Sequence, residues 1–403
     1  MNKKQEIKNR IDLINKGEVP EGYKCCWGYF YPADWSIKKL KDLFNKVKTK
    51  NTDNNTLPVL TNSATQGVIL QDEYFDREIV NDDNADGYYI VEDGDFMYNP
   101  RISSNAPAGP INRNHLGKNG IASPLYTVFR AKRDKNIEFI ENYFKSNYWH
   151  RYMKSVSNQG ARHDRLNLTD DDFMGMPIPQ PSEKEQEKIA EILSCCDEVI
   201  ELKENLLIEK KQEKKYLLQI LLKELPSSNS CKLGDICDIT TGKLDANAQV
   251  ADGKYRFYTC AAEYYYIDKY AFDTEALLIS GNGANVGYIH YYKGKFNAYQ
   301  RTYVLDKFKC NIHYIKYRLD YILNQIISRE KNAGNTPYIV LSTLQNVNIY
   351  LPKDISEQTR IVNILSEKDK EIELLEQELE QYKQLKKSLS QLLLTGIVMV
   401  NEV

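Results

Sequence analysis

The chain has 403 residues, enough for two or three domains, and 42% of them are hydrophobic, which is ample for globular cores. No run of 18 apolar residues occurs, so the sequence predicts no membrane span. The net charge of −2 does not exclude nucleic-acid binding, because basic residues can gather in patches. No signal-like start and no Cys-x-x-Cys or histidine metal spacing occurs, so we expect a cytoplasmic protein without a metal site.

The first part of the chain is predicted to be a helical lead-in at residues 1–20, followed by a globular domain at residues 21–181. Prolines close this domain, since proline ends both strands and helices. The predicted elements are a helix with Ile37, Leu40, Leu43 and Phe44, strands at 59–60, 88–91, 96–98 and 123–129, and one helix over 137–153.

A second globular domain is expected at residues 226–352. A first long helix at 182–225 precedes it, and a second long helix with a C-terminal tail at 353–403 follows it. The order of elements resembles that of the first domain, with strands, one helix, a polar loop and an exit strand. The predicted elements are strands at 255–259, 276–280, 288–292 and 301–305, and a helix over 312–327.

The two long helices are copies of each other. Residues 185–222 align with residues 357–394 at an offset of 172 without a gap, and 20 of the 38 aligned positions are identical. The globular segments show no such identity. We therefore expect the helices to share one task and the two globular domains to differ in theirs.

Apolar residues along each helix follow alternating steps of three and four, which is the seam of a coiled coil. The first copy places Lys203, Lys210 and Lys214 on this seam, so it is a poor partner for itself and a tolerable one for the second copy. A whole domain lies between the copies, which favours antiparallel packing over a generic coiled-coil spacer. The expected pairing or partner-interface residues are Ile189, Leu193, Ile200, Leu207, Leu217, Leu221, Ile361, Leu365, Ile372, Leu375, Leu379, Leu389 and Leu393.

Several motifs at domain and helix boundaries together resemble those of one protein family. They are Trp35-Ser-Ile-Lys-Lys-Leu at the start of the first domain, Met176-Pro-Ile-Pro-Gln-Pro and Ile349-Tyr-Leu-Pro before the two long helices, and Leu393-Leu-Thr-Gly-Ile-Val near the C-terminus. In this order they resemble the start of a target-recognition domain, the entries into the two long helices and the C-terminal segment of the specificity subunit of a Type I restriction–modification enzyme. The expected fold is therefore two mixed α/β (α+β) target-recognition domains, separated and joined by two long antiparallel coiled-coil helices, with a pseudo-two-fold internal repeat.

The resemblance implies that each domain reads one half of a bipartite sequence in double-stranded DNA. The paired helices would fix the unread spacer and dock two methyltransferase (modification) subunits, which recruit two restriction (motor and nuclease) subunits. S-adenosylmethionine, ATP and magnesium would be bound by those partners. This chain would hold no cofactor and no catalytic residue.

Two polar loops just before the exit strands are our main candidates for DNA contact. Arg and Lys match guanine edges and phosphates, and Asn and Gln match adenine. A solvated surface loop is the plainer interpretation of either one, but the equivalent position in both halves favours DNA contact. The candidates are Lys154, Asn158, Gln159, Arg162, His163 and Arg165 in the first loop, and Arg329, Lys331, Asn335, Thr336 and Tyr338 in the second.

Other polar residues near predicted strand ends are weaker candidates. The stretch 281–287 resembles a phosphate-cradling glycine loop, but an alternating strand pattern follows it where a dinucleotide site needs a helix. We therefore predict a hairpin or a DNA-facing loop there, and a second hairpin-like turn at Gly294. These weaker candidates are Arg101, Asn282, Asn285, Lys293, Lys295 and Arg301.

Two alternative functions stay open on the sequence. One is a self-contained DNA methyltransferase or nuclease with embedded recognition domains, although Asn99-Pro100-Arg101 lacks the second proline and the aromatic residue of the methyltransferase motif Asn-Pro-Pro-aromatic. The other is a coiled-coil adaptor that does not bind DNA. Neighbouring methyltransferase and helicase–nuclease genes would favour the specificity subunit over both.

Overall fold

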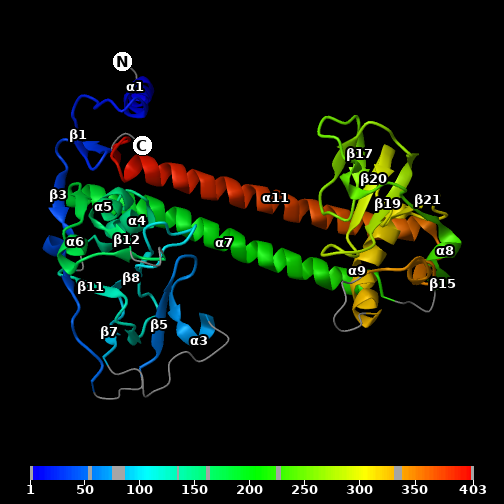
Figure 1. The fold of residues 1–403 in the computed structure, drawn as a ribbon, viewed down its shortest axis with the longest axis horizontal. Coiled ribbons are helices and arrows are strands. Elements are labelled where there is room, and N and C mark those ends of the chain that lie inside the picture. Colours follow the sequence, from blue (N-terminus) through cyan, green and yellow to red (C-terminus); the bar gives the residue numbers. More distant parts are fainter. Residues whose placement is uncertain are drawn as a thin grey trace. The chain divides into compact units, whose positions relative to one another are not determined.

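The computed structural model describes residues 3–52, 57–74, 87–133, 136–159, 164–223, 228–330 and 338–400, without the side chains of residues 159, 228, 229, 329 and 330. The chain divides into unit 1, Met1–Leu202 with Leu379–Val403, and unit 2, Lys203–Glu378. Two helices of 39 residues, α7 (Glu183–Leu221) and α11 (Ile355–Leu393), each contribute to both units (Figure 1). Their bounds differ by 172 residues at both ends, so the predicted pair of equal long helices is confirmed.

Unit 1 is built on two four-stranded sheets. The first has the order β6 (Gly67–Leu70), β5 (Val59–Ser63), β10 (Gly120–Ala122), β7 (Tyr89–Val91), with β10 parallel to β5 and antiparallel to β7. The second is antiparallel, in the order β4 (Phe44–Lys46), β11 (Thr127–Ala131), β8 (Phe96–Tyr98), β9 (Ile111–Arg113). Three strand pairs complete the unit: β1 (Tyr23–Cys26) with β2 (Tyr29–Pro32), β3 (Ser36–Lys39) with β14 (Pro177–Gln180), and β12 (Asn158–Gln159) with β13 (Leu166–Asn167).

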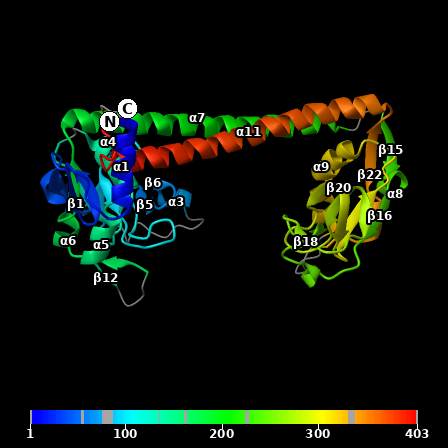
Figure 2. The same ribbon diagram turned by 90° about the horizontal axis from the view of Figure 1, so that it is seen from above.

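The core of unit 1 is aromatic and includes the ends of both long helices. Phe96 and Phe129 stack with ring centroids 5.4 Å apart, and both are fully buried. Leu193 of α7 and Leu393 of α11 belong to the same core, so burial of apolar area ties the helices to this unit. The shorter helices are α1 (Lys3–Asn15), α2 (Leu40–Leu43), α3 (Gln71–Tyr74), α4 (Ile137–Lys145), α5 (His150–Val156) and α6 (Asp170–Met174), with α4 beside the start of α7 (Figures 1 and 2).

Two of the helices predicted in unit 1 are wrong. The helix predicted over 137–153 is broken into α4 and α5, because the Ser146 hydroxyl donates to the Tyr143 carbonyl (2.6 Å) and the Trp149 indole N–H donates to the Phe144 carbonyl (3.0 Å). The helix predicted around Ile37 is instead β3, the single turn α2 and β4. Ile37 pairs with Pro179 of β14, a partner far along the chain that no local pattern reveals.

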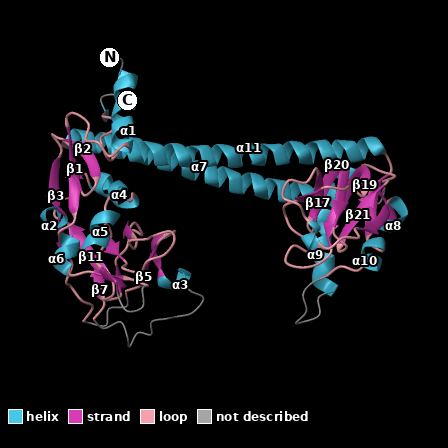
Figure 3. Ribbon diagram, turned by 45° about the horizontal axis from the view of Figure 1, so that its top comes forward, coloured by secondary structure: helices cyan, strands magenta, loops and turns pink. Residues whose placement is uncertain are grey.

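Unit 2 is built on one six-stranded sheet with α9 (Ile312–Glu330) against it (Figure 3). Leu277 and Ile279 of the sheet share a core with Leu319 of α9 and with Ile361 and Leu365 of α11. Helix α9 therefore lies between the sheet and α11 (Figure 2). The strands of this sheet lie in the order β16 (Asp238–Thr241), β21 (Thr302–Asp306), β19 (Phe272–Ser280), β20 (Ile289–Ala298), β17 (Tyr255–Tyr258) and β18 (Tyr265–Ile267). The other elements of unit 2 are the strand pair β15 (Ser228–Lys232) and β22 (Asn348–Pro352), the helices α8 (Leu233–Ile236) and α10 (Leu341–Gln345), and the 3₁₀ turn Ala246–Ala248.

The long helices pack antiparallel within unit 2. Lys203 lies 2.8 Å from Glu378, and Lys210 lies 2.9 Å from Glu371, so seven residues forward on α7 match seven residues back on α11. Lys214 pairs with Asp369 in the same register. The lysines on the seam of α7 thus meet carboxylates on α11, which is why α7 suits α11 better than a copy of itself.

Within unit 1, Lys386 of α11 forms an ion pair with Asp197 of α7. All thirteen apolar seam positions expected from the sequence are buried or half-buried. Ile189, Leu193, Ile361, Leu365 and Leu393 are the most completely buried of them, each at most 4% exposed.

Candidate nucleic-acid interface

In unit 1 a strand end and the first polar loop are joined by a backbone bridge. Arg101, which follows β8, forms an isolated antiparallel bridge with Arg165. The Ile102 N–H donates to the Asp164 carbonyl, and the Leu166 N–H donates to the Pro100 carbonyl, each at 3.0 Å. The structure therefore brings together two candidates, Arg101 and Arg165, that the sequence placed in separate segments.

A buried asparagine network holds this strand end in place. Asn62 is 2% exposed, and its amide donates to the Met97 carbonyl (2.7 Å) and the Pro110 carbonyl (3.0 Å). Its side-chain oxygen accepts from the Asn112 amide at 2.7 Å. Asn99 donates to the Asn62 carbonyl and accepts from the Arg101 N–H, so Asn99 orients the backbone on which Arg101 sits.

The side chains at this bridge are cationic and accessible. Arg101 is exposed, as are Lys154 and Asn158 nearer the start of the loop. Arg165 Nε lies 3.4 Å from Asp164 Oδ1, and both side chains are partly exposed. An exposed pair of this kind contributes under about 1 kcal/mol, so Arg165 can exchange its carboxylate for a phosphate or a guanine edge.

Unit 2 contains the same kind of bridge. Asn282, which follows β19, forms an isolated antiparallel bridge with Tyr338. The Ile339 N–H donates to the Gly281 carbonyl (2.8 Å), and the Gly281 N–H donates to the Arg301 carbonyl (2.9 Å). Three candidates, Asn282, Arg301 and Tyr338, are thereby gathered around one glycine.

Close packing at Gly281 explains why no larger residue fits there. A Cβ on Gly281 would lie 2.4 Å from the Arg301 carbonyl oxygen and 2.9 Å from the Tyr303 ring. The Tyr303 hydroxyl also donates to the Ile339 carbonyl at 2.8 Å, which holds the segment next to Tyr338. The Tyr338 side chain is 61% exposed beside this closely packed backbone.

The two bridges occupy equivalent places in the chain. Each joins the end of a sheet strand, β8 or β19, to a residue that precedes a short helix, α6 or α10, and then the exit strand, β14 or β22. The stretch after β19 is the turn of the β19–β20 hairpin, so the hairpin predicted there is confirmed. Asn285 lies in that turn, and its amide donates to the Cys260 carbonyl at 3.2 Å.

The turn predicted at Gly294 is wrong. Gly294 lies inside β20, paired with Thr274, and its φ of +132° bends a continuous strand. Lys293 lies 3.5 Å from Glu275 and Lys295 lies 3.9 Å from Asp273, so carboxylates on the neighbouring strand β19 already face both lysines. Neither lysine belongs to the group around Gly281.

Part of the predicted set lies outside the described residues or has no described side chain. These candidates are Gln159, Arg162, His163, Arg329, Lys331, Asn335 and Thr336. Conversely, sequence reasoning missed Asn62 and Asn112, which position the first bridge. The available signal was the polar run Thr61-Asn62-Ser63, which is buried throughout although it lies in a strand.

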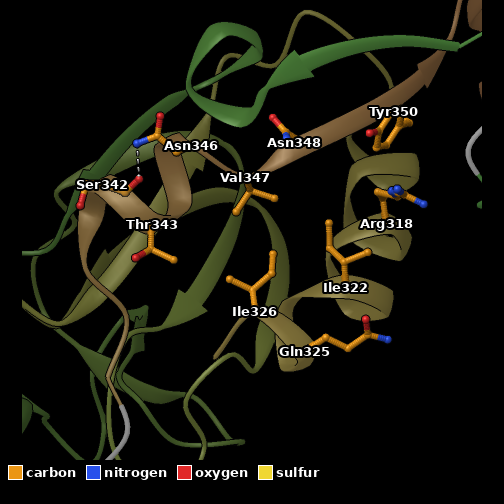
Figure 4. A pocket seen from close by; sticks show the side chains of 10 residues that line it. All are labelled: Arg318, Ile322, Gln325, Ile326, Ser342, Thr343, Asn346, Val347, Asn348 and Tyr350. Atoms are coloured by element: carbon orange, nitrogen blue, oxygen red, sulfur yellow. Dashed lines mark hydrogen bonds between the residues drawn. The ribbon is translucent and has the colours of Figure 1, made fainter. Parts of the chain in front are cut away.

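A separate pocket of about 670 Å³ lies between α9, α10 and β22 (Figure 4). Arg318 lines it, is 5% exposed and donates to the carbonyl of Leu222 at the end of α7. Its guanidinium carbon also lies 5.4 Å from the Tyr350 ring centroid. Arg318 therefore ties α9 to the last turn of α7, and this pocket contains none of the candidate DNA contacts.

The search for metal sites covered the described ranges only, and in them no three His, Cys, Asp or Glu side chains group as metal ligands. In the same ranges no helix is long and apolar enough to cross a membrane.

Comparisons with known proteins agree with this architecture. A family model described as the Type I restriction modification DNA specificity domain matches residues 32–212 and 228–384. Over 165 residues the chain is 39% identical to the Type I restriction enzyme EcoDI specificity subunit of Escherichia coli, which covers 41% of the chain and about a third (36%) of that subunit. Over 428 residues it is 23% identical to the MjaVIII specificity subunit of Methanocaldococcus jannaschii, which covers 94% of the chain and 96% of that subunit.

Solved structures show the same fold. The S subunit of a Type I restriction–modification system from M. genitalium superposes with a TM-score of 0.59 at 16% identity, covering 89% of this chain and 96% of that one. A chain from a study of complex assembly and conformational transition in the type I R-M system gives 0.59 at 18% identity, covering 91% and 99%. The two segments matched by the family model make up most of the sequence, so this chain belongs to the Type I restriction–modification DNA specificity family, as a specificity subunit that carries the family's domain twice.

Proposed function

We propose that the two bridged clusters are the DNA-reading sites of this specificity subunit, and that each reads one half of a bipartite target. The observation that carries the proposal is the repetition of one backbone bridge, Arg101 with Arg165 and Asn282 with Tyr338. A duplicated chain that keeps one link in both copies but changes its side chains is suited to reading two different half-sites.

The chemistry of the two clusters differs. Arg101 and Arg165 can each form paired hydrogen bonds with guanine or a phosphate. Asn282 offers the donor and acceptor that match adenine, and the exposed ring of Tyr338 offers apolar contact for a thymine methyl group. We therefore expect a guanine-containing half-site for unit 1 and an A·T-containing half-site for unit 2.

Membership of the family supports a proposal for the partners of this chain. The chain acts in the cytoplasm with DNA and with the other subunits of a Type I complex, two methyltransferase subunits and two restriction subunits. The paired helices fix the unread spacer and dock the methyltransferases. S-adenosylmethionine, ATP and magnesium bind to those partners, and this chain contributes recognition without catalysis.

A methyl-transfer assay tests whether DNA recognition and catalysis belong to different subunits. The purified chain with S-adenosylmethionine and DNA is expected to transfer no methyl group, and the same mixture with its methyltransferase subunit is expected to methylate a bipartite site. Methylation by the isolated chain would identify it as a self-contained enzyme. Absence of DNA binding by the assembled complex would favour the adaptor function.

A further inference from the structure

Arg256 of β17 contacts two tyrosine rings on the surface of unit 2. Its guanidinium carbon lies 4.2 Å from the ring centroid of Tyr264 and 4.6 Å from that of Tyr292. One guanidinium nitrogen donates to the Tyr258 hydroxyl at 3.4 Å. We call these four residues the arginine clamp. Two rings thus contact the guanidinium, while its hydrogen bond to Tyr258 uses only one of its five N–H donors.

The charge of Arg256 is not neutralised by a carboxylate in the described part of the chain. Arg130 and Arg360, in contrast, are paired with acids, Arg130 with Asp95 at 2.7 Å and Arg360 with Glu357 at 2.9 Å. An arginine held by aromatic rings keeps its positive charge available for an anion, and the stacking reduces the entropy lost when it binds.

An aromatic path connects the arginine clamp to the candidate interface of unit 2. The ring of His290 lies 5.1 Å from Tyr258 in the clamp and 4.7 Å from Tyr288 in the β19–β20 turn. The same turn contains Asn285, whose amide donates to the carbonyl of Cys260. The His290 ring forms a hydrogen bond with the carbonyl of Ala261, the residue that follows Cys260. Burial lowers the pKa of His290, so its ring is neutral at pH 7 and does not repel an arginine nearby.

We propose that Arg256 binds a phosphate of the DNA backbone beside the half-site read by unit 2. This inference rests on the proposed function and adds a contact that the sequence did not suggest. The geometry favours a phosphate over a base. Reading a base requires a side chain that extends into a groove about 8.5 Å deep, whereas the Arg256 guanidinium is held against the rings of Tyr264 and Tyr292. Its free N–H edge suits the paired oxygens of a phosphate on the outer rim of the duplex.

The test uses the full-length chain assembled with its methyltransferase subunit. Arg256→Gln removes the charge but keeps a planar group against the rings, and Arg256→Lys keeps the charge. Lys295→Ala is the matched control, because Lys295 also lies over a tyrosine, Tyr270 at 4.7 Å, but faces Asp273. The dissociation constant is measured against salt concentration on target and unrelated DNA.

Arg256→Gln is expected to weaken binding to all sequences alike and to reduce the slope of log affinity against log salt by about one. Arg256→Lys is expected to retain most of the wild-type slope, and Lys295→Ala to change it little. An unchanged slope for Arg256→Gln overturns the proposal, and so does a loss confined to one base pair, which would make Arg256 a base-reading residue.

A second measurement changes the DNA instead of the protein and then combines that change with Arg256→Gln. Neutral methylphosphonates are placed singly at the phosphates around the half-site of unit 2, and one position is expected to lower affinity by about the same factor as Arg256→Gln. The two changes together are then expected to cost no more than either alone. Additive losses, or no sensitive phosphate, overturn the proposal. If the wild-type complex does not bind DNA at all, the proposed function itself fails, which is a separate outcome.

Discussion

The two units make the same backbone bridge and hold it by different means. In unit 1 a buried amide network centred on Asn62 fixes the strand end that carries Arg101. In unit 2 the close packing of Gly281 against Arg301 and Tyr303 does so. The link between strand end and loop is therefore what the duplicated chain retains, while its support and its side chains are free to diverge.

The paired helices, in contrast, keep the same ion pair in both units. Lys214 with Asp369 in unit 2 and Lys386 with Asp197 in unit 1 are the same pair at an offset of 172 residues. The pair Lys203 with Glu378 has no such counterpart, because the equivalent positions hold Leu375 and Leu206. The helices therefore share a common register and add a charge pair that only the α7–α11 combination provides.

The largest effect is expected from breaking the support in unit 1. Asn62→Ala removes the amide that donates to the Met97 and Pro110 carbonyls and accepts from Asn112, and should lower the free energy of unfolding by about 2–4 kcal/mol. Thr61→Val is the control, since Thr61 is also buried but its side chain makes one hydrogen bond, to the Tyr126 hydroxyl, and should cost about 1 kcal/mol. Chemical denaturation measures both. Equal costs would show that the network does not hold the bridge.

The matching change in unit 2 is Gly281→Ala. The added methyl group clashes with the Arg301 carbonyl and should cost about 1–3 kcal/mol. It should also expose the Ile339 amide, which donates to Gly281, to hydrogen exchange. Gly283→Ala meets no atom within 4 Å, so it should strain the local backbone at its φ of +82° but leave Ile339 protected. Protection of Ile339 in both variants would contradict the account.

Acid is expected to weaken unit 1 through Glu141. Burial raises the pKa of this carboxyl, but hydrogen bonds and charges from His115 and Lys145 outweigh it and lower the pKa from 4.5 to about 2. A lowered carboxyl pKa stabilises the fold above pH 4.5, and this stabilisation is lost as pH falls toward 2. Glu141→Gln should therefore cost on the order of 2–3 kcal/mol at pH 7 and nothing near pH 2. A cost that does not vary with pH would show that the charge of Glu141 is not its source.

The smallest effect is expected at the helix pair. Lys203→Glu places a carboxylate against Glu378 and should destabilise the protein by under about 1 kcal/mol, less at high salt. Adding Glu378→Lys should restore the wild-type melting temperature. Lys188→Glu is a control within α7, because Lys188 pairs only along its own helix, with Glu191 at 3.6 Å, in the described ion pairs. Failure of the double change to restore stability would contradict the antiparallel register.

Long-period patterns predicted the fold better than local ones. The repeat at 172 residues predicted α7 and α11, because each is a long uninterrupted helix whose apolar residues recur at the spacing of a coiled coil. The helix of unit 2 predicted over 312–327 is α9, nearly to its ends. In unit 1 the strand β3 was missed because its partner, β14, follows at the far end of the domain.

The residue types of the candidate site were predictable from the sequence, but the backbone pairing that brings distant residues together was not. Arg101 and Arg165 stand out singly, one near a predicted strand end and the other in the first polar loop, but their meeting depends on backbone pairing between distant segments. Lys293 and Lys295 looked equally suitable, and only the register of β19 and β20 shows that they lie opposite Glu275 and Asp273, away from the group around Gly281. Arg256 gave no signal, since the tyrosines around it come from two other segments.

The most direct test of separate half-site recognition is to map methylated sites in DNA from cells that carry the assembled modification complex. The map is compared for the wild type, Arg165→Ala and Asn282→Ala. We predict that Arg165→Ala relaxes one half of the bipartite sequence, that Asn282→Ala relaxes the other, and that the spacer length stays constant, with about 1–3 kcal/mol of discrimination lost at each affected base. Relaxation of both half-sites by either change, or of neither by both, would contradict the account.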